Sequence, residues 1–324
     1  MFAITVDAPG GAEVLHFTEV VDPEPHPGEV RIAVHAAGVN RADILQRKGF
    51  YPPPQGITDI LGLEVAGVIE STAGDSRWKV GDEVVALLAG GGYGEFAVVP
   101  DGQCAPLPQG LSMIEAAAIM EIAATVVSNF NHIRLCPGET ILIHGGAGGI
   151  GSFAIPYAKH LGLTVITTVG NPTKADHARN LGADAAIDYH EDWESQVRDV
   201  APAGVDAIVD IMGAKYLEAH VNLLTRGGRM VVIGLQGGTK GTLDLNKLLG
   251  KSGTITATSL RFRPVEEKAA IVTEVVQDIW PLFEAGTIPL PTITTFPLAD
   301  ARLAHERLES GENVGKIVLV NSAL

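Results

Sequence analysis

A run of glycines near the middle of the chain carries the clearest chemical signal. The segment His144-Gly-Gly-Ala-Gly-Gly-Ile-Gly151 follows the apolar stretch Thr140–His144 and precedes a stretch of helical character. Glycines permit a tight turn close to a pyrophosphate, and the N-terminus of a helix favours phosphate. Because a second apolar stretch ends about twenty residues later, the pattern predicts a dinucleotide site rather than a glycine loop without a ligand. The residues expected to contact the dinucleotide here are Gly146, Gly148, Gly149, Ile150 and Gly151.

The end of the second apolar stretch indicates which dinucleotide is bound. An acidic residue at that point would bind the ribose 2′-hydroxyl group and select NAD. The sequence Ile166-Thr-Thr-Val-Gly-Asn-Pro-Thr-Lys174 contains no acid, and the first one that follows is Asp176. Lys174 could neutralise a 2′-phosphate while Asn171 donates a hydrogen bond to it, or Lys174 could be an ordinary solvated helix residue. We interpret the missing acid as favouring NADPH.

Composition narrows the classes of partner and compartment. Of the 324 residues, 46% are hydrophobic and 19% are charged, which is typical of a folded chain long enough for two domains. The formal net charge of −15 disfavours nucleic acid and membrane surfaces as partners. We find no signal peptide and no apolar run as long as a membrane helix. The sequence therefore predicts a cytoplasmic protein that acts on a small molecule.

Side chains that bind metals are scarce. The two cysteines, Cys104 and Cys136, can form neither a disulfide framework nor a four-thiolate zinc site. The ten histidines show no spacing typical of metal ligands, and helix surfaces are the expected place for several, including His220 and His305. We therefore expect no bound metal.

Two contrasting patterns divide the chain. Short alternating strands such as Val30–Ala37, punctuated by Gly and Pro, indicate an irregular, partly open barrel in the first hundred residues. From Thr140 to Leu260, alternating strands and helices predict βαβ units and a parallel sheet. A long helix over 265–285, a strand over 288–296 and the strand Lys316–Val320 should return to the barrel. We expect a catalytic domain of residues 1–120, completed by residues 265–324, and a cofactor domain of residues 121–264.

Motifs along nearly the whole chain resemble one family. They are similar to the zeta-crystallin-type quinone oxidoreductases of the medium-chain dehydrogenase/reductase superfamily, and closest to their inducible branch. The resemblance implies an α/β fold with a GroES-like β-barrel and a Rossmann doubly wound parallel sheet. It also implies NADPH-dependent quinone reduction and a homodimer. The motifs that carry it are Ala36–Asp43, Gln46–Pro54, Leu61–Gly67, Lys79–Val84, Gly138–Leu142, Leu260–Arg263 and Gly315–Val318.

The residues at the superfamily's zinc positions indicate zinc-free chemistry. Related alcohol dehydrogenases bind catalytic zinc through a Cys in the segment that matches Gly38–Asp43 and a His-Glu pair in the segment that matches Gly62–Glu64. Here the first segment lacks cysteine, and Leu63 stands at the histidine position, where it cannot bind a metal. Direct hydride transfer without a metal suits a conjugated acceptor, such as a quinone or an activated alkene.

Other site residues follow from the resemblance. Residues that match Asn40, Asp43 and Tyr51 line the site near the nicotinamide, and Tyr51 could donate a proton to a quinone oxygen. Alternatively, Tyr51 packs on Pro52–Pro54, Asn40 forms a turn, and Asp43 is an ordinary helix N-terminal residue. The remaining cofactor contacts that the resemblance implies are Thr125, Gly170, Tyr189, Gly234, Leu235, Ser259, Arg261 and Lys316.

Two other functions remain open, and three residues depart from the family pattern. The chain could reduce α,β-unsaturated carbonyls as an enoyl or alkenal reductase, or it could bind NADPH with little turnover. Asn171 replaces a usual serine, which slightly weakens the NADPH prediction. Pro156 should bend the helix that follows the glycine turn, and Glu121 begins a stretch whose small residues predict a wider substrate pocket.

Overall fold

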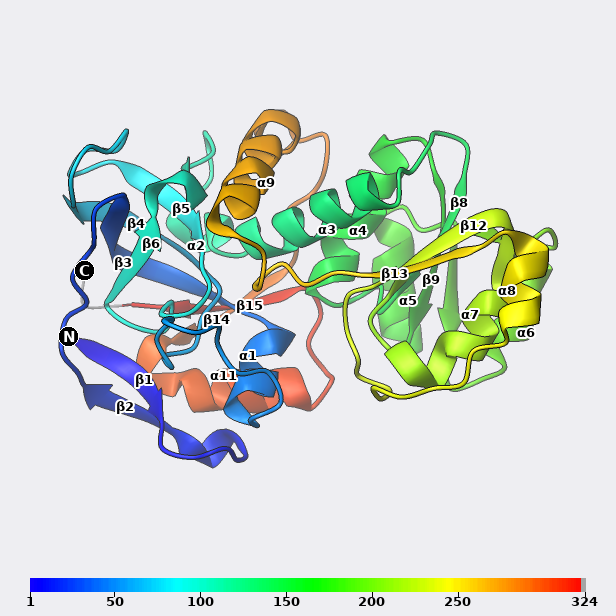
Figure 1. Cartoon of the computed structure of the whole chain (residues 1–324), viewed down its shortest axis with the longest axis horizontal. Helices are drawn as coiled ribbons and strands as arrows, with labels where there is room; N and C mark the ends of the chain where they lie inside the picture. The colour runs from blue at the N-terminus through cyan, green and yellow to red at the C-terminus, as the bar shows by residue number, and fades with distance from the viewer. Residues whose placement is uncertain (322–324) are drawn as a thin grey trace. The chain divides into compact units, whose positions relative to one another are not determined.

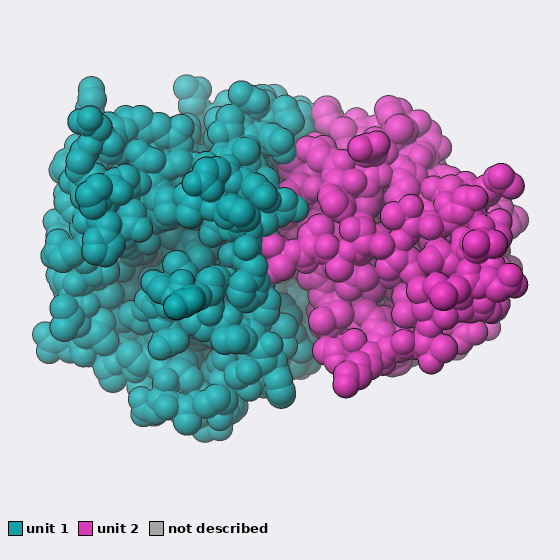
Figure 2. Space-filling model, in the orientation of Figure 1, with its two compact units in different colours: residues 1–124, 260–324 teal, residues 125–259 magenta. Residues whose placement is uncertain are grey.

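The computed structural model describes residues 1–321 of the chain, which divides into two compact units (Figure 2). Unit 1 contains residues 1–124 and 260–324, and unit 2 contains residues 125–259. The boundaries expected from the sequence fall after residues 120 and 264, and the last three residues of the expected catalytic domain lie outside the described part. Each unit has its own sheet and core.

Unit 2 is built on a six-stranded parallel sheet in the order β10-β9-β8-β11-β12-β13 (Figure 1). The chain enters at β8, moves outward through β9 and β10, and returns to β11 on the other side of β8. This reversal creates the switch point at which doubly wound sheets bind ligands. The strands are β8 (Thr140–His144), β9 (Thr164–Val169), β10 (Ala185–Asp188), β11 (Val205–Asp210), β12 (Leu224–Val232) and β13 (Thr254–Ala257).

The helices of unit 2 connect these strands, as the alternating pattern of the sequence predicts. Buried aliphatic side chains such as Leu142, Ile166 and Ile208 form the core around the sheet. Helix α4 continues through Pro156, although proline removes one backbone donor. The helices are α4 (Gly149–His160), α5 (Pro172–Asn180), α6 (Trp193–Val200), α7 (Leu217–Leu223) and α8 (Leu245–Lys251).

Unit 1 contains a seven-stranded sheet in the order β14-β15-β3-β4-β5-β7, with β6 also paired to β3, and a separate β1-β2 hairpin. Strand β15, from the C-terminal end of the chain, pairs with β3 in antiparallel fashion, so this segment returns to the barrel as expected (Figure 1). The strands are β1 (Phe2–Val6), β2 (Leu15–Glu19), β3 (Glu29–Val39), β4 (Glu64–Thr72), β5 (Glu83–Leu87), β6 (Phe96–Pro100), β7 (Cys104–Pro106), β14 (Ile293–Pro297) and β15 (Lys316–Val320).

The C-terminal segment corrects two element predictions. The single long helix expected over 265–285 is two helices, because Pro281 lies in the first turn of the second one and cannot continue the first. The strand expected over 288–296 begins only at Ile293, after two prolines. The helices of unit 1 are α1 (Arg41–Arg47), α2 (Met113–Ala116), α9 (Val265–Asp278), α10 (Trp280–Glu284) and α11 (Ala301–Glu309).

One helical stretch contradicts the expectation that no segment reaches the length of a membrane helix. Met113–His132, which contains α2 and α3 (Met120–His132), is long and apolar enough to span a membrane by length and composition. Within its most apolar window, 78% of the residues are buried inside the protein. Such burial is typical of a core helix.

Candidate active site and cofactor site

The glycine turn of unit 2 is packed tightly against β9. Gly145 has a φ of +76°, and the amides of Gly145 and Gly146 both donate to the carbonyl oxygen of Thr168, at 3.1 and 3.0 Å. A Cβ added to Gly146 would lie 2.2 Å from the Thr167 hydroxyl oxygen, and one on Gly151 would lie 2.5 Å from the turn backbone. At Gly148, the nearest atom would be 3.5 Å away. A side chain at Gly146 or Gly151 would therefore clash with the protein itself, whereas Gly148 has room for a Cβ.

The first turn of α4 follows this loop, with Gly148 as its N-cap. Residues Gly149, Ile150 and Gly151 form that turn, and the first amides of a helix have no acceptor within the helix. Those amides and the helix dipole favour a phosphate group. The local geometry thus fits the dinucleotide predicted from the sequence.

A second group of candidate cofactor residues lies where β9 and β10 end. A Cβ on Gly170 would lie 2.5 Å from the Tyr189 hydroxyl oxygen, so a larger residue at position 170 would clash with this tyrosine at the end of β9. Asn171 caps α5, because its side-chain oxygen accepts from the Lys174 amide at 2.9 Å. Burial lowers the pKa of Lys174, whose side chain is partly covered. Three polar residues and one glycine therefore follow the ends of β9 and β10, where the sequence predicts the 2′-phosphate.

The other candidate contacts of unit 2 also lie near strand ends or in α3. Gly234 and Leu235 follow β12 and Ser259 follows β13, on the carboxyl edge that also carries the glycine turn. Thr125 is buried in α3, and its carbonyl oxygen accepts from Ser128 and Asn129. In a parallel sheet, the carboxyl edge is the ligand-binding edge.

Two histidines expected on helix surfaces are in fact fully buried. His220 of α7 contacts His144 at the end of β8, with 2.8 Å between their Nε2 atoms, and His144 also contacts the Thr168 hydroxyl at 2.8 Å. Burial lowers the pKa of His220 to about 3 and that of His144 well below its ordinary value. Two neutral imidazoles therefore support the strand ends that carry the glycine turn. His305 is buried against Tyr93 in unit 1.

In unit 1, Asn40 and Asp43 begin helix α1 as a capping box. The Asp43 carboxylate accepts from the amides of Asn40 and Gly62, at 2.7 and 3.0 Å, and from the Tyr93 hydroxyl at 3.2 Å. Asp43 is fully buried, and burial raises its pKa to about 6. Its contacts fit the structural role that the sequence left open beside a chemical one.

Asn40 is also held by a buried ion pair. The Lys316 ammonium lies 2.6 Å from Glu64 and 2.6 Å from the Asn40 side-chain oxygen, and it also contacts the carbonyl of Val39 at 3.3 Å. The side-chain amide nitrogen of Asn40 donates to the Glu64 carboxylate at 2.9 Å. Lys316 and Glu64 are 2% and 0% exposed, respectively. Lys316, which the resemblance places beside the cofactor, thus has three acceptors inside unit 1. Lys316 and its carboxylate partner Glu64 are 252 positions apart in the sequence.

Tyr51 has a different environment from Asn40 and Asp43. Its ring meets Phe262 edge-on, with 5.4 Å between centroids, and the Arg261 guanidinium lies 5.4 Å from the Tyr51 ring centroid. Arg261 also donates to the Tyr51 carbonyl oxygen at 3.3 Å. Arg261, expected near the cofactor, is therefore buried against the Tyr51 loop within unit 1.

Comparison with known proteins covers both units. Residues 26–109 match the family described as "Alcohol dehydrogenase GroES-like domain", and residues 149–275 match "Zinc-binding dehydrogenase". A quinone oxidoreductase of Pseudomonas aeruginosa is 34% identical over 317 residues, which are 96% of this chain and 97% of that protein. This chain belongs to the quinone oxidoreductase family.

Other relatives of this quinone oxidoreductase family member extend the comparison. The crystal structure of Escherichia coli quinone oxidoreductase complexed with NADPH has a TM-score of 0.88 and 30% identity, and it covers 99% of this chain and 100% of that one. A mycocerosic acid synthase-like polyketide synthase of Mycobacterium tuberculosis is 31% identical over 98% of this chain, which spans 15% of that protein. The predicted GroES-like and Rossmann architecture is confirmed.

The zinc positions in this family member hold unsuitable side chains. Leu63 is a buried apolar residue, and the neighbouring Glu64 carboxylate already has the Lys316 ammonium as its cation. Cys104 is buried, and burial raises the pKa of its thiol to about 12. Within residues 1–321, no three His, Cys, Asp or Glu side chains come together as a metal site.

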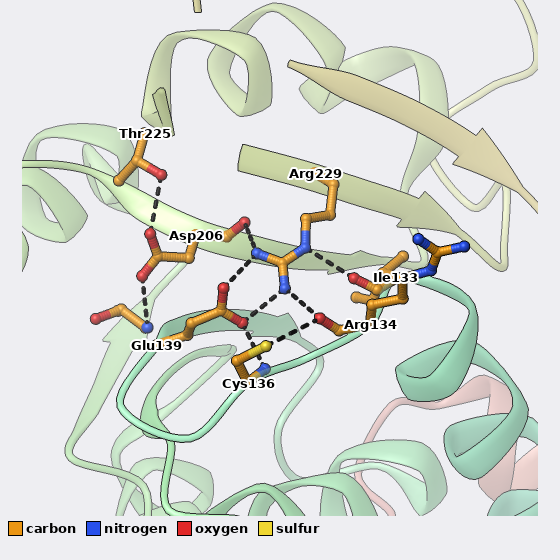
Figure 3. A network of polar contacts seen from close by, with 8 residues as sticks. Ile133, Arg134, Cys136, Glu139, Asp206, Thr225 and Arg229 are labelled. Carbon is orange, nitrogen blue, oxygen red and sulfur yellow. Dashed lines mark hydrogen bonds and ion pairs between the residues drawn. The ribbon is translucent and has the colours of Figure 1, made fainter. Parts of the chain in front are cut away.

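A polar network at the amino edge of the unit 2 sheet was not anticipated (Figure 3). Arg229 of β12 forms two contacts with the Glu139 carboxylate, at 2.7 and 2.6 Å. It also donates to the carbonyl oxygens of Ile133 and Arg134 at 2.8 Å each, and to that of Asp206 at 3.2 Å. The network fastens the α3–β8 connection to β11 and β12, away from the glycine turn.

Proposed function

We propose that this chain reduces quinones with NADPH by direct hydride transfer, without a bound zinc ion. The observation that carries this proposal is the environment of Leu63, which replaces the metal-binding histidine beside a carboxylate that Lys316 already neutralises. Leucine offers no metal ligand, so Lewis-acid catalysis of the alcohol dehydrogenase type lacks its donor set. The full-length similarity to quinone oxidoreductases supports a conjugated acceptor.

The cofactor proposal rests on the geometry of unit 2. The tight turn at Gly146 and Gly151, together with the first turn of α4, fits a pyrophosphate. Lys174 follows β9, which ends without an acid, and the Tyr189 hydroxyl lies against Gly170 at the same strand end, which favours a 2′-phosphate over a free ribose hydroxyl. NADPH supplies the hydride when bound, and the E. coli relative was crystallised in complex with this same dinucleotide.

The reaction also needs a proton, and Tyr51 is the proposed donor. Hydride addition to a quinone gives a hydroquinone monoanion, and transfer of the phenol proton to its oxygen completes the two-electron reduction. Asn40 and Asp43 have buried contacts that orient α1, so we assign them to positioning rather than to proton transfer. Solvent then returns the proton to Tyr51.

Two further features complete the proposal. Strand β13 is the last strand in its sheet order and leaves one backbone edge unpaired, which suits a homodimer formed by strand pairing. A cytoplasmic location agrees with the two free thiols, Cys104 and Cys136, which the structure does not pair with each other.

The decisive experiment compares two acceptor classes. We expect rapid NADPH oxidation with an ortho-quinone and formation of one hydroquinone per NADPH, because the proposed site needs a conjugated acceptor. An α,β-unsaturated carbonyl should react more slowly. This second class is the alternative that the sequence left open. Absorbance of NADPH and chromatography of both products measure the outcome.

A variant at the proposed 2′-phosphate contact serves as the internal control. Lys174→Ala should raise the KM for NADPH about tenfold and leave that for NADH unchanged, because only NADPH carries the 2′-phosphate.

In the comparison of acceptors, faster reduction of the enone than of the quinone would support the alternative enzyme. Tight NADPH binding without turnover of either acceptor would favour a binding protein.

A further inference from the structure

Arg261 is a buried cation without a carboxylate partner. Only 4% of the residue is exposed. Its guanidinium donates to the Ala89 carbonyl oxygen and to the Gln46 side-chain oxygen, each at 2.7 Å, and to the Tyr51 carbonyl oxygen at 3.3 Å. All three acceptors are neutral, and no ion pair of Arg261 occurs within residues 1–321. A buried charge that lacks a counter-ion is costly, so it calls for an explanation.

The same guanidinium lies against the Tyr51 ring. Its central carbon is 5.4 Å from the ring centroid, which is within the range of a cation–π contact. Phe262, the next residue in the chain, meets the ring at 5.4 Å and 89°. Two consecutive residues therefore fix the orientation of Tyr51, and one of them brings a positive charge to it.

Two other charged residues, Asp43 and Lys268, interact with Arg261. Asp43 of α1 is the acid that influences Arg261, and it offsets part of the positive charge from a distance, because its oxygens accept from two backbone amides and the Tyr93 hydroxyl rather than from the guanidinium. Lys268 of α9 adds a second positive charge and is itself mostly buried. Burial lowers the pKa of Arg261, although that of an arginine stays far above neutrality. Of these three charged groups, the arginine is the one that contacts the Tyr51 ring.

We propose that Arg261 is a positioning residue for Tyr51, which fixes the phenol ring and, through a positive charge that no ion pair neutralises, favours proton release from the phenol to the reduced quinone. This inference rests on the proposed quinone reduction. During the step, the phenol O–H bond breaks and an O–H bond forms on the hydroquinone monoanion. The negative charge moves to the phenol oxygen of Tyr51, whose ring contacts the guanidinium, and a proton from solvent neutralises it afterwards.

The test is the pH profile of kcat with an ortho-quinone and NADPH. In the wild type, kcat should fall on the alkaline side as the phenol loses its proton. Arg261→Gln should lower kcat near pH 7 about tenfold and move this alkaline limb upward by about one pH unit, because a nearby positive charge no longer favours the phenolate. Arg261→Lys, which keeps the charge, should retain the position of the limb.

Two controls separate positioning from general damage. Tyr51→Phe should remove the alkaline limb, and adding Arg261→Gln to it should cause no further loss of kcat. Arg263→Gln changes a nearby arginine that pairs with Glu267 at 3.2 Å, and it should leave the profile unchanged. The thermal unfolding of each variant shows that the protein remains folded.

Three results would overturn the inference. The alkaline limb of Arg261→Gln could coincide with that of the wild type, or Arg261→Gln could slow Tyr51→Phe as much as it slows the wild type. A raised KM for NADPH with unchanged kcat would instead assign Arg261 to the cofactor. If the wild type itself reduces no quinone, the proposed function fails and this inference fails with it, whereas an unshifted limb in an active enzyme overturns the inference alone.

Discussion

Two arginines illustrate two uses of a covered positive charge. Arg229, in unit 2, shares its guanidinium with the Glu139 carboxylate and three carbonyl oxygens. Arg261, in unit 1, is more deeply buried and has only neutral acceptors. An arginine that pairs with a carboxylate stabilises the segments that it connects, and the opposite charge cancels most of its electrostatic field beyond the pair. An arginine without such a match keeps a field that acts on its neighbour, which here is Tyr51.

The largest expected effect concerns stability at Arg229. Arg229→Gln removes the bidentate pair and leaves Glu139 partly buried without its cation, so the free energy of unfolding should fall by about 3 kcal/mol. Turnover should stay unchanged, because Glu139 immediately precedes β8, whereas the glycine turn follows the other end of that strand. Urea unfolding followed by circular dichroism measures the first quantity, and NADPH oxidation measures the second.

Arg261→Gln is the matched variant for that experiment. We expect it to lose only about 1 kcal/mol of unfolding free energy, because removal of an unmatched buried charge offsets the lost hydrogen bonds. Its main effect should be on kcat. The contrast between the two arginines breaks down if both variants lose equal stability, or if Arg229→Gln slows turnover as much as Arg261→Gln does.

A smaller, pH-dependent effect sharpens the same contrast. Burial alone would raise the pKa of Glu139, but the hydrogen bond and charge of Arg229 and the Cys136 amide lower it below the ordinary value of 4.5. A carboxylate with a lowered pKa in the folded state adds stability above pH 4.5 and loses it as the pH falls further. The stability gap between the wild type and Arg229→Gln should therefore shrink below that pH.

Urea unfolding at several pH values between about 6 and about 3 measures this gap on both sides of the ordinary carboxyl pKa. The gap between the wild type and Arg261→Gln should change only as Asp43, the acid that influences Arg261, gains its proton near pH 6, since no ion pair joins Arg261 to a carboxylate within residues 1–321. A constant gap for Arg229→Gln would show that Glu139 contributes no charge to the network.

Local sequence patterns predicted much of the fold, and they are also the source of the candidate cofactor residues. The glycines of the turn, the acid-free end of β9 and the alternating strands and helices are all short-range signals. They depend on backbone conformation and on neighbours within a few residues, so one sequence reveals them. Pro281, which marks the break between α9 and α10, is a short-range signal of the same kind.

The missed features depend on long-range contacts. Arg261 and its acceptor Gln46 are 215 positions apart, and His144 and His220 are 76 positions apart. Tertiary packing decides whether a histidine on an amphipathic helix is buried, and no local pattern separates it from an exposed one. For that reason the sequence identified Tyr51 as a candidate but could not show which side chains hold it.

The most direct test of the account is quinone reduction by protein that has been dialysed against a metal chelator. The account predicts NADPH oxidation with an ortho-quinone at the same rate before and after dialysis, with one hydroquinone formed per NADPH, because Leu63 and the Lys316–Glu64 pair leave no zinc-binding set at that position. Loss of turnover on chelation, with recovery when zinc is added, would contradict it.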